Sequence, residues 1–224
     1  MTFRVFIILF LITFSVVKGQ RTSKFSLKPT LGISASQVHG DNYSGYNKLG
    51  FVGGLYVNAA LKEKTSLELG IIFVQKGARR NQNPEKFDYR FYYLNLNYVE
   101  VPLLLRWQPN KFFFTVGGSF AYLINYYESS EIGNLTGMYP FRSTEYSLNL
   151  GIGMMIRPKI GVEVRTNNSI VTIRPFTGFG VPYYNNPVAR YFNKGSYNNV
   201  LQIAFTYKIT SKKERQPSEP KEEI

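Results

Sequence analysis

Cysteine is absent from this 224-residue chain, and histidine occurs once, as His39. The chain therefore has no disulfide framework and no N-terminal cysteine that would carry a lipid. A protein metal site needs three or four ligands, so one histidine and no cysteine argue against a metal site, and no motif indicates a cofactor. Charged residues are also scarce, at 18%, against roughly 25% in an ordinary soluble domain.

The formal net charge of +13 is not concentrated in one place. Basic residues are spread among the segments that connect the apolar patterns and form no dense stripe, which argues against nucleic-acid binding. Two of the positive charges, Arg4 and Lys18, belong to an N-terminal segment of a different character.

Long apolar runs are missing apart from residues 5–17, which follow Arg4. That run has about 13 residues, fewer than the ~20 that a membrane-spanning helix needs. The positive start, the apolar run and the ending Val17-Lys18-Gly19 are typical of a signal peptide that is cleaved after Gly19. We therefore predict a signal peptide over residues 1–19, with a retained membrane anchor as the alternative, and no later transmembrane helix.

Aromatic residues are abundant, at 16%, and the rest of the chain repeats an alternation of period two. In each alternating segment one face carries large aliphatic or aromatic residues. The other face carries Gly, Ser, Thr, Asn and scattered charges, as in strands that lie between two different environments. The segments are residues 25–34, 48–60, 66–76, one that ends at 107, 112–124, 146–156, 160–166 and 200–209.

The connections between these segments are alternately short and long. Short turns surround residues 62–64, 108–110 and 157–159, whereas the links over 37–47, 77–92, 125–143 and 167–199 are long. Bacterial outer-membrane barrels have tight periplasmic turns and long extracellular loops. We therefore predict an all-β fold, an eight-stranded antiparallel up-and-down transmembrane β-barrel over residues 20–210, in a bacterial outer membrane with both termini periplasmic. Residues 211–224 are charged and lack apolar periodicity, which predicts a disordered periplasmic tail.

The apolar face of each segment is expected to point outward into lipid. The interior of an eight-stranded barrel is only just wide enough for side chains, so small and polar residues fit inside, while Phe, Leu and Ile from every strand would overfill it. A soluble lipocalin-like barrel would have the opposite arrangement. Trp107, Phe112, Tyr122 and Tyr207 lie near segment ends, where an aromatic girdle belongs.

Charged residues in the inward phase predict an ionic network inside the barrel. They are Lys28, Glu68, Glu100, Arg106, Glu163, Arg165 and Lys208. Because buried charges must be paired, we expect a structural salt-bridge network that closes the interior. A proton or ion path is the alternative.

The second long link is basic. It holds Lys76, Arg79, Arg80, Lys86 and Arg90, against Glu85 and Asp88. Just above a bilayer these residues would pair with lipopolysaccharide phosphates, as arginine does with phosphate oxygens in general; a solvated loop is the alternative. The long links are also rich in tyrosine, which favours contacts with a partner protein.

One pair of residues raises the question of catalysis. His39 and Asp41 lie close together in the first long link, and an outer-membrane protease would use such a pair to activate water. That chemistry needs further acidic residues from other loops, and the sequence does not place them. We therefore expect no enzymatic activity.

Five stretches of the chain carry a family resemblance. LGFVGGLYVN, LELGIIFVQKGA, LNYVEVPLLLRW, FFFTVGGSFAYLI and the closing LQIAFTYKI resemble the PorT-like family of outer-membrane β-barrel proteins, most specifically at residues 74–77 and 98–105. Gly70 departs from the Glu expected there, with Glu68 nearby, and the charged tail departs from barrels that end at their last strand. The resemblance implies insertion by the barrel assembly machinery. For the family's namesake it implies a part in the secretion of surface proteins through the type IX pathway.

The sequence as a whole favours a monomeric, plugged, non-enzymatic barrel in contact with outer-membrane lipid and lipopolysaccharide. The first functional hypothesis is an accessory of protein secretion or surface assembly, with a secretion-system or periplasmic protein as its partner. The alternative is a structural or adhesive surface protein that acts through its aromatic extracellular loops.

Overall fold

Each of the eight alternating segments forms a long strand. The structure, a computed structural model, describes residues 25–40, 45–175 and 194–210, so the predicted signal peptide and the predicted tail lie outside the described residues. The long strands are β1 (Phe25–His39), β2 (Lys48–Lys62), β3 (Thr65–Arg80), β4 (Tyr92–Trp107), β5 (Phe112–Ser130), β7 (Thr144–Arg157), β8 (Ile160–Ser169) and β10 (Gly195–Tyr207). The short elements are β6 (Gly133–Asn134), β9 (Arg174–Pro175), β11 (Ile209–Thr210) and the 3₁₀ helix η1 (Pro84–Lys86).

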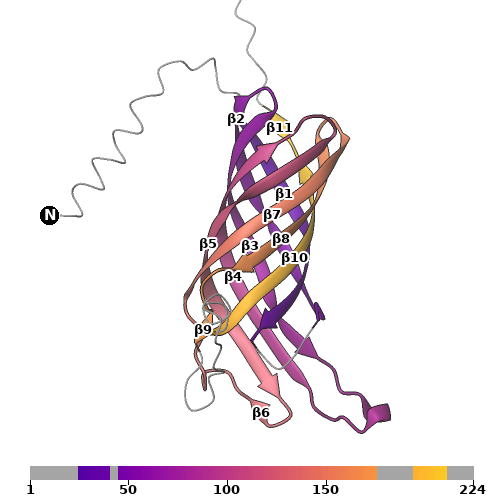
Figure 1. Ribbon diagram of the computed structural model, residues 1–224, viewed down its shortest axis with the longest axis vertical. Helices are drawn as coiled ribbons and strands as arrows, with labels where there is room; N and C mark the ends of the chain where they lie inside the picture. The colour runs from indigo at the N-terminus through magenta and orange to yellow at the C-terminus, as the bar shows by residue number, and fades with distance from the viewer. Residues whose placement is uncertain (1–24, 41–44, 176–193, 211–224) are drawn as a thin grey trace, which may run out of the picture.

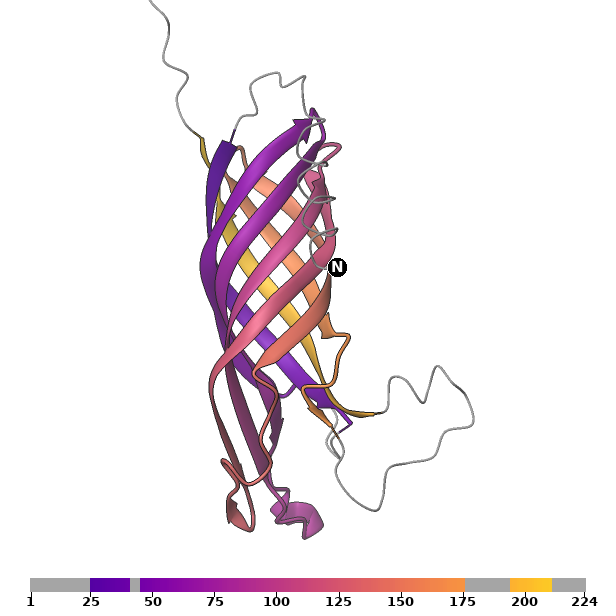
Figure 2. The ribbon, with the colours of Figure 1, turned by 90° about the vertical axis from the view of Figure 1, so that its left-hand side faces the viewer.

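Antiparallel pairing joins the long strands into a closed barrel (Figures 1 and 2). Neighbours in the sequence pair from β1 to β5, and the order continues through β7, β8 and β10. The last strand then pairs with the first, in a register that runs from Thr30↔Thr206 to His39↔Tyr197. The predicted eight-stranded antiparallel up-and-down barrel is confirmed.

The two faces of the strands point as predicted. Leu31 on β1 and Leu150 on β7 are 60% and 58% exposed, whereas the inward Ser34 and Asn149 are almost completely buried. Outward aliphatic and aromatic side chains form a continuous band around the barrel, which we call the lipid-facing band. In a bilayer this band contacts hydrocarbon, and the closed sheet pairs the backbone N–H and C=O groups of neighbouring strands.

The three predicted short turns, between β2 and β3, β4 and β5, and β7 and β8, lie at one end of the barrel, which we call the turn end (the upper end in Figure 1). At the other end, the long-link end, several strands are longer than predicted. β3 continues to Arg80, β4 begins at Tyr92 and β5 continues to Ser130, so the predicted links over 77–92 and 125–143 were too long. The pairs Arg79↔Tyr93 and Tyr93↔Ser129 carry the ladders past the lipid-facing band.

These long strands form an extension with its own apolar core. The β2–β3 ladder reaches only to Val52↔Val74 and the β5–β7 ladder to Tyr122↔Thr144, and beyond these pairs β3, β4 and β5 project past the other strands (Figure 1). The inner face of the extension is apolar and packs on two side chains from the links. This cluster includes Val74, Ala78, Leu94, Leu96 and Tyr98, with Phe141 and Ile173 from the links. The expectation of a small, polar interior is therefore wrong for the long-link end, and toward the turn end it holds only in part, because the large side chains of Tyr56, Leu104 and Phe113 are also buried inside.

Candidate functional site

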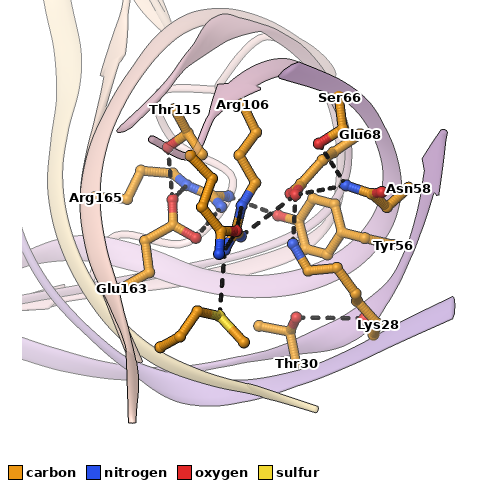
Figure 3. Close-up of polar contacts among 12 residues, drawn as sticks. Lys28, Thr30, Tyr56, Asn58, Ser66, Glu68, Arg106, Thr115, Glu163 and Arg165 are labelled. Atoms are coloured by element: carbon orange, nitrogen blue, oxygen red, sulfur yellow. Dashed lines mark hydrogen bonds and ion pairs between the residues drawn. The ribbon is translucent and has the colours of Figure 1, made fainter. Parts of the chain in front are cut away.

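The inward charges near the turn end form one layer of contacts across the barrel (Figure 3). Lys28 on β1 places its Nζ 2.5 Å from Oε1 of Glu68 on β3, and Nη1 of Arg106 on β4 lies 3.4 Å from the same oxygen. Asn58 donates from Nδ2 to Glu68 Oε1 at 3.1 Å and to Ser66 Oγ at 2.7 Å. One carboxylate therefore accepts contacts from two cations and an amide, on strands that are not all neighbours.

A second carboxylate completes this turn-end layer. Glu163 and Arg165, two residues apart on β8, form a bidentate pair with N–O distances of 3.0 and 2.9 Å. Thr115 donates to Glu163 at 2.6 Å, and Arg165 Nη1 donates to the hydroxyl of Tyr56 at 2.6 Å (Figure 3). The guanidinium is thus held between β8 and β2, on opposite walls of the barrel, and the layer spans the interior.

A middle layer lies farther toward the long-link end. Lys76 Nζ is 2.9 Å from Glu100 Oε2 and 2.8 Å from Glu145 Oε1, and all three side chains are almost completely buried. Asn167 Oδ1 accepts from Lys76 at 2.8 Å, and Asn167 Nδ2 donates to Glu100 at 2.9 Å. Asn198 on β10 donates to the second oxygen of Glu145 at 2.6 Å.

The sequence analysis placed Lys76 both at the end of the predicted strand over 66–76 and in the basic loop, and the loop assignment is wrong. Lys76 lies on β3, and its inward phase continues that of Glu68, Gly70 and Ile72, so the alternation itself would have placed it inside. Glu145 was missed because the predicted strand began one residue later. Its parity with Ser147 and Asn149 is the signal that would have identified it.

Lys208 is also placed differently from the prediction. It follows β10, is exposed, and contacts its surroundings through its backbone N–H, which donates to Lys159 O at 2.7 Å. The alternation continues through Lys208, but the β8–β10 ladder ends at Tyr207↔Ile160, so the side chain is outside the ionic layers. Lys28, Glu68, Glu100, Arg106, Glu163 and Arg165 are buried in the interior as predicted.

The charges of the two layers balance only when the layers are taken together. The turn-end layer has three cations, Lys28, Arg106 and Arg165, and two carboxylates, Glu68 and Glu163; the middle layer has one cation, Lys76, and two carboxylates, Glu100 and Glu145. Along β3, Gly70, Ile72 and Val74 separate the two layers. This pattern, with side chains of both signs in contact across the lumen, favours closure over a continuous polar path.

Between the turn-end layer and the three turns the barrel opens into a cavity of about 560 Å³, which we call the basic vestibule. Its floor includes Lys28 and Arg106, and its rim is formed by the three turns and the end of β10. The charged lining residues are Lys28, Lys62, Lys64, Arg106, Lys111, Arg157 and Lys208, with Glu63 as the acidic one. A concave surface lined by one sign of charge attracts ligands of the opposite sign.

At the long-link end the predicted basic loop separates into groups with different surroundings. Arg80 and Arg90 both pair with Asp88, the latter at 3.0 Å, and their hydrogen bonds hold the pKa of Asp88 well below its usual range. Lys86 is exposed in η1, at the tip of the β3–β4 link. Arg79 is exposed on the outer face of β3, and its Nε donates to Asn81 at 2.8 Å.

The structure describes only one residue of the proposed His39–Asp41 catalytic pair. His39 is exposed at the end of β1, and Asp41 lies outside the described residues. Within the described ranges no three His, Cys, Asp or Glu side chains are grouped as ligands for a metal ion. In the same part of the chain, no helix has the length and apolar character to cross a membrane.

Comparison with known proteins assigns the family. The sequence matches the family model of the outer membrane protein β-barrel domain over residues 18–173, more than half of the chain. The chain belongs to this family. Together with the closed barrel and its lipid-facing band, membership places the protein in a bacterial outer membrane. No curated protein sequence matches the chain.

The chain also aligns with solved outer-membrane barrels at low sequence identity. Ail, the attachment invasion locus protein of Yersinia pestis, aligns over 84% of this chain and all of its own, with 13% identity and a TM-score of 0.46. Neisserial surface protein A aligns over 83% of this chain and 97% of its own, with 10% identity and a TM-score of 0.44. CarO of Acinetobacter baumannii aligns over 80% and 96%, with 10% identity and a TM-score of 0.44.

Proposed function

We propose that this protein is a non-enzymatic outer-membrane barrel that acts by binding at its ends, as an accessory of protein secretion or surface assembly. The observation that carries this proposal is the combination of a closed interior and a basic vestibule. Side chains of both signs meet across the lumen in two layers, whereas a cavity of about 560 Å³ with a strong excess of cations opens at the turn end. A barrel closed in this way offers surfaces for partners rather than a route for cargo.

The proposed orientation places the turn end in the periplasm. Both chain ends of the barrel lie at the turn end, because Phe25 pairs with Ala59 near the β2–β3 turn and Thr210 pairs with Ser26. Short turns face the periplasm in bacterial barrels. The basic vestibule would then meet an acidic surface of a periplasmic or secretion-system protein, and the predicted tail over residues 211–224 would begin beside it. The resemblance to the PorT-like family supports the same role.

The first experiment compares the secreted and surface proteins of cells with and without the gene. We expect a set of exported proteins to accumulate in the periplasm of the deletion strain. Complementation with a Lys64→Glu, Lys111→Glu chain should fail to restore export, because the rim of the vestibule loses its positive excess. A Lys86→Glu chain, changed at the opposite end, is the matched control and should restore it. An unchanged secretome in the deletion strain would exclude the secretion role.

The predicted tail provides a second, independent test. A chain that lacks residues 211–224 should reach the outer membrane, because the ladders that close the barrel end before residue 211. If a periplasmic partner docks on the tail, this chain will not restore export. If export is fully restored, the tail has no part in the proposed role.

An adhesive surface protein is the second candidate, favoured by the tips of the extension. Phe87 in the β3–β4 link and Ile132 beside β6 are 85% and 80% exposed. Tyr89, Met138 and Tyr139 in the same links are also exposed. Large apolar side chains that gather on an exposed surface often mark a site where another protein binds. Phe87→Ser and Ile132→Ser should then reduce cell adherence several-fold while secretion stays normal; unchanged adherence counts against this candidate.

A further inference from the structure

We propose that the outer face of β3, β4 and β5, just beyond the lipid-facing band, binds the phosphorylated saccharide head group of a lipid of the outer leaflet. We call this surface the amide face. The proposal uses the outer-membrane location and the orientation with the long links outside, and is independent of any role in secretion.

The amide face begins where the outward side chains of the strands change from apolar to amide. On β4, Trp107, Leu105, Leu103 and Val101 are outward and apolar, and Asn97 and Asn95 follow them toward the long-link end. The same change occurs on both neighbouring strands at the same height, because Gln75, Asn97 and Asn125 stand in one register row. Three amides side by side mark the level at which hydrocarbon contact ends and head groups begin.

The amides are already held in a row by their own hydrogen bonds. Gln75 Nε2 donates to Asn97 Oδ1 at 3.1 Å, and Asn97 Nδ2 donates to Asn125 Oδ1 at 2.6 Å. Asn95 also donates to Asn97 Oδ1, at 3.3 Å. After these bonds Gln75 and Asn97 each keep a second amide N–H, which can donate to a hydroxyl oxygen of a sugar.

Aromatic and cationic groups border the row on its far side. The rings of Tyr93 and Tyr127 lie 6.2 Å apart, and Lys48 Nζ lies 5.5 Å from the centre of the Tyr93 ring. Arg79 is the cross-strand partner of Tyr93, and the two line a shallow depression of about 470 Å³ that lies beyond the amide row and is otherwise lined by Arg80, Asn81, Gln82, Phe91 and Tyr92. Tyrosine rings supply flat apolar faces with a polar edge for a sugar ring, and an exposed arginine supplies the forked donor that fits a phosphate.

The opposite wall of the barrel carries a second amide row that serves as an internal comparison. Gln37, Asn199 and Asn168 on β1, β10 and β8 are also register partners beyond the lipid-facing band. Oxygens of both rows accept hydrogen bonds within the protein: Gln37 Oε1 accepts from Gly45 N–H at 2.9 Å and Asn199 Oδ1 from the Tyr46 hydroxyl at 2.7 Å, and on the amide face Gln75 Oε1 accepts from Phe51 N–H at 3.2 Å. The amide face differs in its tyrosine pair and in Arg79, and those features assign the phosphorylated saccharide to it.

Binding is measured on the full barrel in phospholipid nanodiscs, with lipopolysaccharide of short saccharide length as the probe. Arg79→Gln should raise the dissociation constant about tenfold, because it removes a charge-assisted contact with phosphate. Asn97→Leu should weaken binding to a similar degree. Gln37→Leu, the matched change on the opposite wall, should leave the dissociation constant unchanged. If all three variants bind as the parent does, or all three weaken equally, the assignment to the amide face is overturned.

Two further probes separate the phosphate from the sugar. Enzymatically dephosphorylated lipopolysaccharide should bind the parent chain about as weakly as intact lipopolysaccharide binds Arg79→Gln, and the Arg79→Gln chain should no longer distinguish the two. Phosphatidylglycerol, which has a phosphate and no sugar, should bind the parent more weakly than lipopolysaccharide. Equal affinity for phosphatidylglycerol would overturn the saccharide part of the proposal. All chains must show the same gel shift on boiling, so that a misfolded variant is not counted.

Discussion

At the scale of single residues, the stability of the turn-end layer depends on Glu68. Among the described residues it is the one carboxylate in salt bridges with both Lys28 and Arg106, at 2.5 and 3.4 Å, and all three side chains are at most 5% exposed. A buried ion pair contributes little net stability compared with an apolar pair of the same shape, but removing one partner leaves an uncompensated charge. The interior is therefore sensitive to a change that keeps the shape of a side chain and removes its charge.

Glu68→Gln is the change that tests this sensitivity. The substitution leaves two buried cations beside a neutral amide, so we expect the free energy of unfolding to fall by about 3–5 kcal/mol. The measurement is a urea titration of the purified barrel in lipid, followed by gel mobility before boiling. Lys208→Gln removes a charge from an exposed side chain at the same end and should change the free energy of unfolding by less than about 0.5 kcal/mol. Equal effects of the two substitutions would contradict the placement of the two residues.

At the scale of strands, the close approach of neighbours in the sheet depends on small inward residues. A Cβ on Gly117 of β5 would lie 2.1 Å from the carbonyl oxygen of Leu103 on β4, whereas a Cβ on the adjacent Gly118 would have its nearest neighbour at 3.8 Å. The difference arises because Gly117 points inward and Gly118 outward. Adjacent glycines in one strand thus have opposite tolerance for a methyl group.

This pair of glycines provides a matched test of the strand phase. Gly117→Ala must push β4 and β5 apart or bend them locally, and we expect a loss of about 1–3 kcal/mol in the free energy of unfolding. Gly118→Ala adds a methyl group to the lipid-facing side and should be neutral within about 0.5 kcal/mol. Both are measured by the same urea titration. The opposite order of effects would mean that the inward and outward faces of β5 are exchanged.

A bulge on β5 exchanges the inward and outward positions of that strand where it enters the extension. Asn97 pairs with Asn125 and Tyr98 pairs with Leu123, which leaves Ile124 as an extra residue. Ile124 and Asn125 are therefore both exposed. Beyond them the even-numbered Glu128 and Ser130 are buried, whereas on the turn-end side of the bulge the odd-numbered residues are buried. One extra residue reverses the parity of every position that follows it in the strand.

At the scale of the whole molecule, side chains from many strands meet across the lumen at several levels. The turn-end layer reaches from β1, β3 and β4 to β8 and β2, and the middle layer joins β3, β4, β7, β8 and β10. Farther toward the long-link end the apolar cluster of the extension fills the interior. From these three levels of packing we predict that the basic vestibule is a pocket with a floor and not the mouth of a channel.

Electrical recording tests whether the interior is sealed. We expect the purified barrel in a planar lipid bilayer to give no stable conductance steps, because ions would have to displace paired charges and then cross an apolar cluster. A heat-denatured sample and bilayers without protein set the baseline. Reproducible steps from the folded protein, absent from both controls, would falsify the plugged interior and revive the ion-path interpretation.

The alternation of residue types by itself determined the number of strands, the face of each that meets lipid, the end that carries the short turns and six of the seven predicted interior charges. These features depend on local periodicity and on the limited width of an eight-stranded interior, and both follow from the sequence alone. The tertiary structure decided where strands end and which charges meet. Lys76 and Glu145 lie inside and Lys208 lies outside, because the length of a strand depends on how far its neighbour continues the ladder. Contacts across the barrel join residues that are far apart in the sequence, and their spacing along the chain does not indicate which of them meet.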